Sequence, residues 1–356
     1  MNLRKNRETR SLIHKPRDYS IKNKQLIPLL YLGLLLFGVF TLSLGRYPIS
    51  IKEIIDVGKA FLNQEMSQKE KLLAQILITI RLPRIIAAII TGSCLSAAGA
   101  AMQATFKNPM VSPSLLGVSS GSAFGAALGI LLHFNHSGIQ IVSFAFGLTT
   151  VLIVYSLNSI INQDNHSTTG LILTGIVVSS LFTSLISLLK YVADPYESLP
   201  AITFWLMGSL NQISLSQLLP IILPVALGLG LLLVFRWRIT ILSFGQEEAS
   251  SVGLNYKLTR IIIVLATTMM TASVVSISGL IGFVGLIVPH ITRMLVGENY
   301  TRVIPASIAI GGIYLLVIDT ISRSLFSAEI PLGILTSIIG TPFFIILLIH
   351  NSREYS

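Results

Sequence analysis

The sequence predicts an all-α fold, that of a polytopic membrane protein with about ten transmembrane helices. Hydrophobic residues make up 52% of its 356 positions and charged residues 11%, and the mean hydropathy is +0.77. Soluble domains carry about 25% charged residues. About ten apolar segments of the chain are also close to the roughly 20 residues that a helix needs to cross a bilayer. We therefore expect one transmembrane domain over residues 26–350.

The chain opens with a basic segment, residues 1–25, which holds eight of the 25 Lys and Arg residues. The net charge of +10 is thus concentrated ahead of the first apolar run, which indicates a cytoplasmic tail rather than nucleic-acid binding. That run, 26–44, is too long for a signal-peptide core and no small-residue cleavage site follows it. We expect it to be the first span, and residues 351–356 to be a cytoplasmic C-terminus.

Polar connections separate the later spans. The first connection, 46–80, mixes lysines with acids and is expected to be partly helical, and a polar insert at 194–197 leads into a short apolar piece at 202–210. An even number of spans places both termini on one side, and the segments on that side hold 16 of the 25 Lys and Arg residues, which predicts cytoplasmic termini. The spans expected after the first are 85–106, 114–133, 139–161, 170–189, 218–235, 260–278, 281–296, 303–321 and 331–350.

The second and third spans are rich in small residues. Residues 85–106 consist largely of Ala, Gly and Ser, and after Lys107-Asn108-Pro109 the glycines at 117, 121, 125 and 129 fall along one helical stripe. Small residues let helices approach closely in lipid. We expect these two segments to form a tightly packed helix pair.

No motif in the chain supplies catalysis or energy. The only Gly-Lys pair, Gly58-Lys59, lacks the upstream glycine of a phosphate loop, the six histidines are scattered, and the single Cys94 lies inside an apolar segment. We therefore expect no enzyme active site, no metal site and no cofactor bound by this chain. If it moves a solute uphill, an ion gradient or a partner ATPase must drive it.

A long polar interruption, residues 236–260, lies on the predicted cytoplasmic side. Ser243-Phe244-Gly245 precedes a stretch that reads as a short helix, because its acids fall in the first turn where the helix dipole favours them. Gly253 would close this helix about two turns later. A short helix outside the membrane offers a surface to a partner, and a solvated loop helix without a partner is the alternative.

The chain resembles the FecCD family of permeases, which import iron-siderophores, haem and vitamin B12 with an ABC-type ATPase. The similarity runs from residue 81 to the C-terminus and leaves the basic tail outside. The matching strings are RLPR with its small-residue helix (81–103), KNPMVSPSLLGVSSG (107–121), SFGQEEASSVGLN (243–255), SGLIGFVGLIVPHITRMLVG (278–297) and DTISRSLFSAEIPLGILTSIIGTPFFIILL (319–348).

The resemblance implies contacts at both membrane faces. The loop over 243–255 would carry the coupling helix that contacts the ATPase, with the contact made by Gly245, Glu247, Glu248, Ala249, Gly253 and Leu254. Outer-face arginines that pair with acids of a substrate-binding protein match Arg81, Arg84 and Arg323, and the guanidinium fork suits carboxylates. Two alternatives stay open. Arg81 and Arg84 would extend their side chains to the membrane–water interface without a protein partner. Arg323 would pair with Asp319, four residues earlier on the same helix.

The resemblance also places an inner gate at the loop that enters the fifth span, here Ser167, Thr168 and Thr169. The alternative is that these hydroxyls cap the helix that begins near Gly170. Glu329, just before Pro331 at the outer edge, is a further functional candidate because it is ionisable.

The function implied is that of the transmembrane permease subunit of an ABC importer with a vitamin-B12-importer-like fold, most often for an iron-siderophore. Haem and vitamin B12 are alternative cargoes. The implied partners are a second permease copy or paralogue, a cytoplasmic ATPase dimer that uses the ATP, and an extracytoplasmic binding lipoprotein. The implied location is a bacterial cytoplasmic membrane. A secondary transporter driven by an ion gradient is the rival class, but it needs an intramembrane charge relay for which Asp319 is the main candidate.

Overall fold

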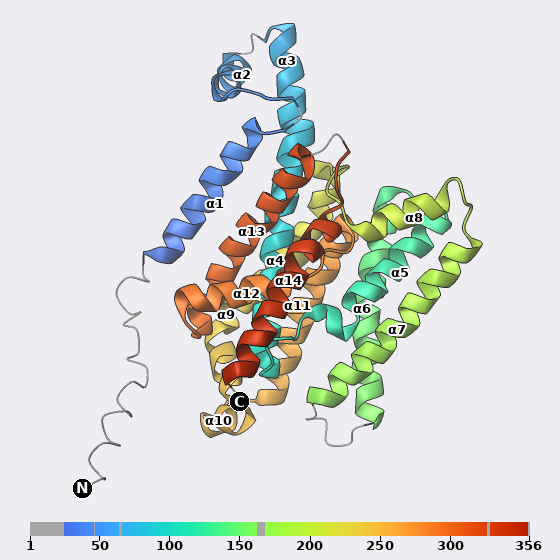
Figure 1. Ribbon diagram of the computed structural model, residues 1–356, viewed down its shortest axis with the longest axis vertical. Coiled ribbons are helices and arrows are strands. Elements are labelled where there is room, and N and C mark those ends of the chain that lie inside the picture. Colours follow the sequence, from blue (N-terminus) through green and yellow to red (C-terminus); the bar gives the residue numbers. More distant parts are fainter. Residues whose placement is uncertain (1–24, 46, 64–65, 162–167, 326–327, 355–356) are drawn as a thin grey trace.

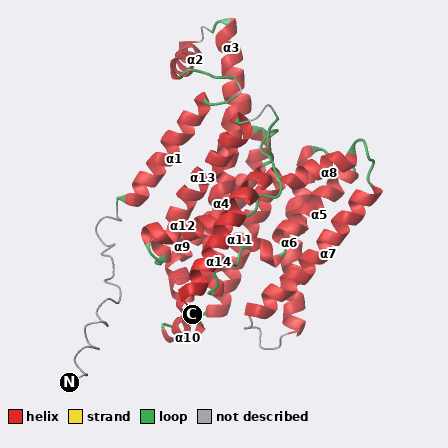
Figure 2. Cartoon of the chain, in the orientation of Figure 1, coloured by secondary structure: helices red, strands yellow, loops and turns green. Residues whose placement is uncertain are grey.

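The computed structural model describes residues 25–45, 47–63, 66–161, 168–325 and 328–354, and every regular element in these ranges is a helix (Figures 1 and 2). The all-α prediction is confirmed. The elements are α1 Leu26–Ser43, α2 Ile51–Asn63, α3 Gln68–Gln75, the π-helix η2 Ile76–Arg81, α4 Leu82–Phe106, the 3-10 helix η3 Pro113–Leu116, α5 Val118–Leu131, α6 His136–Ile161, α7 Thr168–Val192, α8 Ser198–Met207, α9 Leu215–Phe244, α10 Gln246–Ser251, α11 Tyr256–Ser278, α12 Val284–Val296, α13 Tyr300–Ser324 and α14 Leu332–Glu354.

Each of the ten predicted spans contains a helix. Within the described residues, 7 helices are long and apolar enough to cross a membrane, namely α1, the continuous helix Gln68–Phe106, α6, α7, α9, α11 and α13. The other three predicted spans correspond to the shorter apolar helices α5, α12 and α14. α5 begins late because η3 and Gly117, with φ +85°, occupy the start of its predicted span.

The helix α4 is the centre of the molecule. Every residue from Thr91 to Phe106 is buried. A Cβ on Gly92 would lie 2.1 Å from the carbonyl oxygen of Gly311 in α13, and a Cβ on Gly99 would lie 1.9 Å from that of Gly285 in α12. The small residues of this segment therefore allow backbone-to-backbone contact with two other helices.

The expected pairing of α4 with α5 is wrong. α4 packs mainly against α13 and α11, whereas α5 packs against α6. The glycine stripe of α5 faces that partner, since a Cβ on Gly121 would lie 1.9 Å from Thr150 Oγ1. Lys107, which ends α4 with φ 50°, and η3 turn the chain away before α5 begins.

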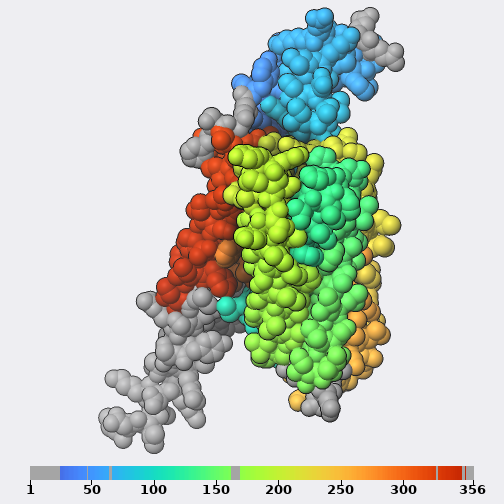
Figure 3. Space-filling model, turned by 90° about the vertical axis from the view of Figure 1, so that its right-hand side faces the viewer, coloured from blue at the N-terminus to red at the C-terminus, as the bar shows by residue number. Residues whose placement is uncertain are grey.

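The connection between α1 and α4 forms a helical lobe that projects beyond the body (Figures 1 and 3). As expected, it is partly helical, with α2 and α3 side by side around a small core of Val57, Leu73 and Leu77. Glu53 of α2 pairs with Lys69 of α3 at 2.7 Å. This hydrogen bond lowers the pKa of Glu53 to about 2, so the carboxylate is charged and the pair is intact at neutral pH.

Substitution Gly92→Ala is expected to destabilise the protein by about 1–3 kcal/mol, the usual cost of overpacking, because α13 must move to admit the new methyl group. The measurement is thermal unfolding in detergent. Gly33→Ala in α1 is the matched control, since no atom lies within 4 Å of its new Cβ. A Gly92→Ala variant with the same melting temperature as the wild type would contradict this account of α4 packing.

Candidate functional site

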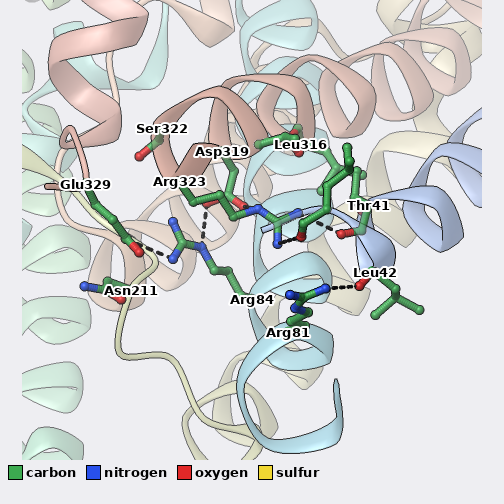
Figure 4. A network of polar contacts seen from close by, with 12 residues as sticks. Thr41, Leu42, Arg81, Arg84, Asn211, Leu316, Asp319, Ser322, Arg323 and Glu329 are labelled. Carbon is green, nitrogen blue, oxygen red and sulfur yellow. Dashed lines mark hydrogen bonds and ion pairs between the residues drawn. The ribbon is translucent and has the colours of Figure 1, made fainter. Parts of the chain in front are cut away.

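The end of the molecule that carries α2 contains a buried ionic network (Figure 4). Arg84, in the first turn of α4, donates from Nε to Asp319 Oδ1 of α13 at 2.8 Å and from Nη1 to Glu329 Oε2 at 2.9 Å. Arg323 Nε lies 3.6 Å from the second oxygen of Asp319. Asp319 is fully buried, so its charge is balanced by two guanidinium groups in a place with little water.

The same arginines hold the end of α1. Arg323 donates to the carbonyl oxygens of Leu44 and Thr41, each at 3.0 Å. Arg81 donates to the carbonyl oxygens of Leu42 and Tyr47. These bonds satisfy carbonyls at a helix C-terminus, which lack partners within the helix. The network therefore joins α1, α4, α13 and the segment before α14.

The three arginines predicted to dock a binding protein thus come together, but inside the protein. Arg81, Arg84 and Arg323 are 5%, 6% and 5% exposed, and each has partners within the chain. The alternative pairing of Arg323 with Asp319 is present. Docking of a binding protein by these side chains stays a prediction.

A cavity of about 950 Å³ opens beside the network. Glu329 belongs to both, since it accepts from Arg84 and lines the cavity. Of the other lining residues, Glu197 lies in the predicted polar insert, and Ser278, Gly279 and Pro331 lie in the family-like strings at 278–297 and 319–348. The lining includes the polar or aromatic side chains of His133, Phe134, His136, Glu197, Phe204, Trp205, Asn211 and Gln212.

Two backbone hydrogen bonds hold the segment after α8 beside the cavity. The amide of Ser209 donates to the carbonyl of Ser278 at 2.8 Å, and the amide of Leu332 donates to that of Gly208 at 2.9 Å. These bonds tie the end of α8 to α11 and α14. Within the described residues, no group of three or more His, Cys, Asp and Glu side chains is placed to hold a metal ion.

The opposite end of the molecule carries the predicted coupling helix, α10 (Figure 1). Its N-cap is Gly245, with φ +140°, whereas the hydroxyl of Ser243 donates back to the carbonyl of Thr240. Glu247 and Glu248 are exposed in the first turn and Ala249 is fully buried. One side of α10 is therefore anchored and the other presents two acids.

The end of α10 also follows the sequence prediction. Gly253 has φ +74°, and the amide of Leu254 donates to the carbonyl of Ala249 at 3.0 Å. Together these features end the helix and turn the chain into α11.

Lys107 contacts the segment that leads into α10, a role that the sequence did not predict. Its Nζ donates to the carbonyl of Phe244, the last residue of α9, at 2.6 Å. Gly245 has φ +140°, a conformation that residues with a side chain rarely adopt, and a Cβ there would also lie 3.0 Å from the same Nζ and 2.6 Å from Glu248 Oε2. The sequence feature that could have pointed to Lys107 is the family-like string that begins with Lys107-Asn108-Pro109.

The predicted gate is only partly described. Ser167 lies outside the described residues, α7 begins at Thr168, and Thr169 is exposed in its first turn. The gate therefore stays a prediction.

These features define a class: a multi-pass membrane protein with a cavity of polar and apolar side chains at one end and a short, acid-bearing helix at the other. Residues 33–350 match the FecCD transport family, and the chain belongs to that family. It is similar to the Molybdate import system permease protein MolB of Haemophilus influenzae, with 38% identity over 324 residues, 91% of this chain and 95% of that protein.

Two further comparisons agree with this assignment. The Hemin transport system permease protein HmuU of Yersinia pestis is 31% identical over 344 residues, 94% of this chain and 99% of that protein. A solved ABC transporter in an inward-facing conformation matches with a TM-score of 0.82 and 36% identity, covering 92% of this chain and 99% of that chain. The chain is thus the permease subunit of an ABC importer, a family that implies ATPase and substrate-binding partners, and not a secondary transporter.

Substitution Asp319→Asn is expected to cost about 3–5 kcal/mol of stability, because it leaves two buried guanidinium groups without their shared carboxylate. Glu329→Gln is the comparison variant and should cost less, since the Glu329 side chain is 19% exposed. Thermal unfolding of both proteins in detergent measures the difference. Equal melting temperatures for the two variants would be inconsistent with this network.

Substitution Lys107→Gln is expected to slow uptake several-fold while the protein still folds, because Phe244, which leads into α10, loses its bond from the end of α4. The readouts are uptake and ATP hydrolysis by the reconstituted importer. Lys257→Gln, an exposed lysine in the first turn of α11, serves as the control and should leave both unchanged. If the Lys107→Gln variant takes up cargo at the wild-type rate, the bond from Lys107 to Phe244 is not needed for transport.

Proposed function

We propose that this chain forms the translocation path of an ATP-driven importer for an iron-siderophore. The observation that carries this proposal is the cavity of about 950 Å³ at the α2 end. It is large, it contains the aromatic rings of Phe134, Phe204 and Trp205, and its lining includes two carboxylates and, among the described residues, no Lys or Arg. A bulky organic chelate suits such a chamber better than a small free dianion does.

The α2 end then faces outward and the α10 end faces the cytoplasm of a bacterial membrane. Figure 1 supports this orientation, because α14 ends at the end of the molecule that carries α10, and α1 runs from the middle of the molecule toward the α2 end. Residues 1–25, which precede α1 in the sequence, are basic, and the positive-inside rule favours the cytoplasm for them.

At the cytoplasmic end, α10 contacts the ATPase through Glu247 and Glu248. Gly245, Ala249, Gly253 and Leu254 hold the helix in place, as their backbone geometry and burial support. The ATPase binds and hydrolyses the ATP, and this chain binds no cofactor. Motion of α10 then reaches α9 and α4 through the carbonyl of Phe244 and the ammonium of Lys107.

At the outer end, a binding lipoprotein delivers the cargo near Arg81, Arg84 and Arg323. Because these arginines are buried, docking would require Glu329 or another partner to release a guanidinium group. A second permease copy or a paralogue completes the path, and Ser167, Thr168 and Thr169 close it on the inside. Haem and vitamin B12 are alternative chelates for the same chamber.

Molybdate is the second candidate cargo. It is favoured by the MolB relative, which is 38% identical over 324 residues. It is disfavoured by the carboxylates of Glu197 and Glu329 in the cavity lining.

The test is uptake in a strain that lacks this chain and its paralogues, supplied separately with labelled hydroxamate siderophore, catecholate siderophore, haem, vitamin B12 and molybdate. We expect loss of siderophore uptake, with the other cargoes unaffected. Loss of molybdate uptake alone would replace the iron proposal with the oxyanion alternative. Plasmid-borne wild-type chain is the control and should restore uptake.

Substitution of both Glu247 and Glu248 by Lys is expected to abolish stable association with the ATPase and reduce uptake at least tenfold, because it reverses the charge presented by α10. Co-purification and uptake are measured together. Glu298→Lys changes an exposed acid in the α12–α13 connection and is expected to have a much smaller effect. Intact association of the double variant would show that these acids do not form the contact.

A further inference from the structure

The helix α2 has two apolar faces, and only one of them is used inside the protein. Val57 and Ala60 are buried against α3. Ile51, Ile55 and Leu62 are 60%, 51% and 81% exposed. At 100° per residue these three side chains fall within a sector of about 40° on the helix surface, so they form a continuous stripe.

The rotation of α2 about its axis is fixed by polar contacts. Glu53 accepts from the amide and the hydroxyl of Ser50, each at 3.0 Å, and from Lys69 of α3 at 2.7 Å. These bonds lock the start of α2 and its attachment to α3. The exposed stripe is therefore held outward and is not a core face in an alternative rotation.

The stripe lies next to a surface that faces lipid. α1, a membrane span, ends at Ser43, and Leu42 in its last turn packs against the core of the α2–α3 lobe. The outward side of α1 consists of exposed apolar side chains up to Val39 and Phe40. The exposed apolar surface thus continues from α1 toward α2 at the membrane boundary.

The direction of α2 also fits the plane of a membrane. Figure 1 shows α2 nearly end-on beside α3, whereas α1 and α13 are seen from the side, so α2 runs across the direction of the spans. A span lies along the bilayer normal, and a helix across it lies along the bilayer surface.

Two lysines border the stripe on one side. Lys52 and Lys59 are exposed and, seven residues apart, fall on the same flank of α2, at about 80–100° from Ile51. An apolar stripe bordered by lysines is the pattern of helices that lie in the headgroup region, where the ammonium groups reach phosphates and the stems cover apolar surface.

We propose that α2 lies in the headgroup region of the leaflet at its end of the molecule, with Ile51, Ile55 and Leu62 inserted at the acyl boundary and Lys52 and Lys59 on lipid phosphates. α2 is then an anchor that fixes the lobe, and with it the residues just before Arg81, at a defined depth. This inference needs only the membrane location of the chain and is independent of cargo and of ATP.

The test uses the full chain in lipid nanodiscs, with Cys94→Ala removing the native thiol. Leu62→Cys is labelled with an environment-sensitive fluorophore, and Gln68→Cys, exposed at the start of α3, is the matched control. With lipids brominated near the top of the acyl chain, we expect blue-shifted emission and quenching several-fold stronger at position 62 than at position 68. Equal, weak quenching at both positions would overturn the proposal. So would loss of quenching at position 62 when the cargo-loaded binding protein is added, because the face would then belong to that protein.

The lysine contacts are tested separately. Quenching at position 62 is expected to be stronger with phosphatidylglycerol than with phosphatidylcholine, and the pair Lys52→Gln and Lys59→Gln should remove that difference. No dependence on lipid charge in the unmodified helix would overturn the phosphate contacts. Because neither experiment involves transport, their failure is distinct from a failure of the importer proposal.

Discussion

The structure depends on close contact between the backbone of α4 and those of its neighbours. Gly92 meets Gly311 and Gly99 meets Gly285 at distances that exclude any side chain. In lipid, association of helices relies on such packing, because apolar surface gains little by leaving one apolar medium for another. α13, α12, α11 and α9 all pack directly against α4, and α1 packs mainly against α13.

Because α4 is fixed along its length, its two ends carry polar contacts that need precise placement. Arg84 in its first turn pairs with Asp319 and Glu329, and Lys107 at its C-cap holds the carbonyl that precedes α10. The cavity borders the first set and α10 adjoins the second. One helix therefore connects the ionic network and cavity at one end of the molecule with α10 at the other.

The sequence predicted most of the helices, but it did not predict which helices pack together or most of the side-chain contacts between them. Hydropathy and helical period are local properties, and they placed the ten apolar segments and the short helix that bears Glu247 and Glu248. The pairing of α4 with α13 instead of α5 could not be predicted, because Gly92 and Gly311 are far apart in sequence. The arginines were recognised from their motif, but the bonds from Arg81 to the carbonyls of Leu42 and Tyr47 could not be predicted, because both residues are far from Arg81 in the sequence. The i, i+4 spacing of Asp319 and Arg323 was the one network contact visible in advance.

The continuous helix Gln68–Phe106 is longer than a bilayer is thick. Its 39 residues correspond to about 58 Å, against about 30 Å for the hydrocarbon core. At the α2 end this helix therefore extends past the hydrocarbon core, and α3 forms that extension, with α2 packed against it. The number of residues between 66 and 81 therefore sets how far the α2–α3 lobe projects beyond Arg81 and the buried ionic network.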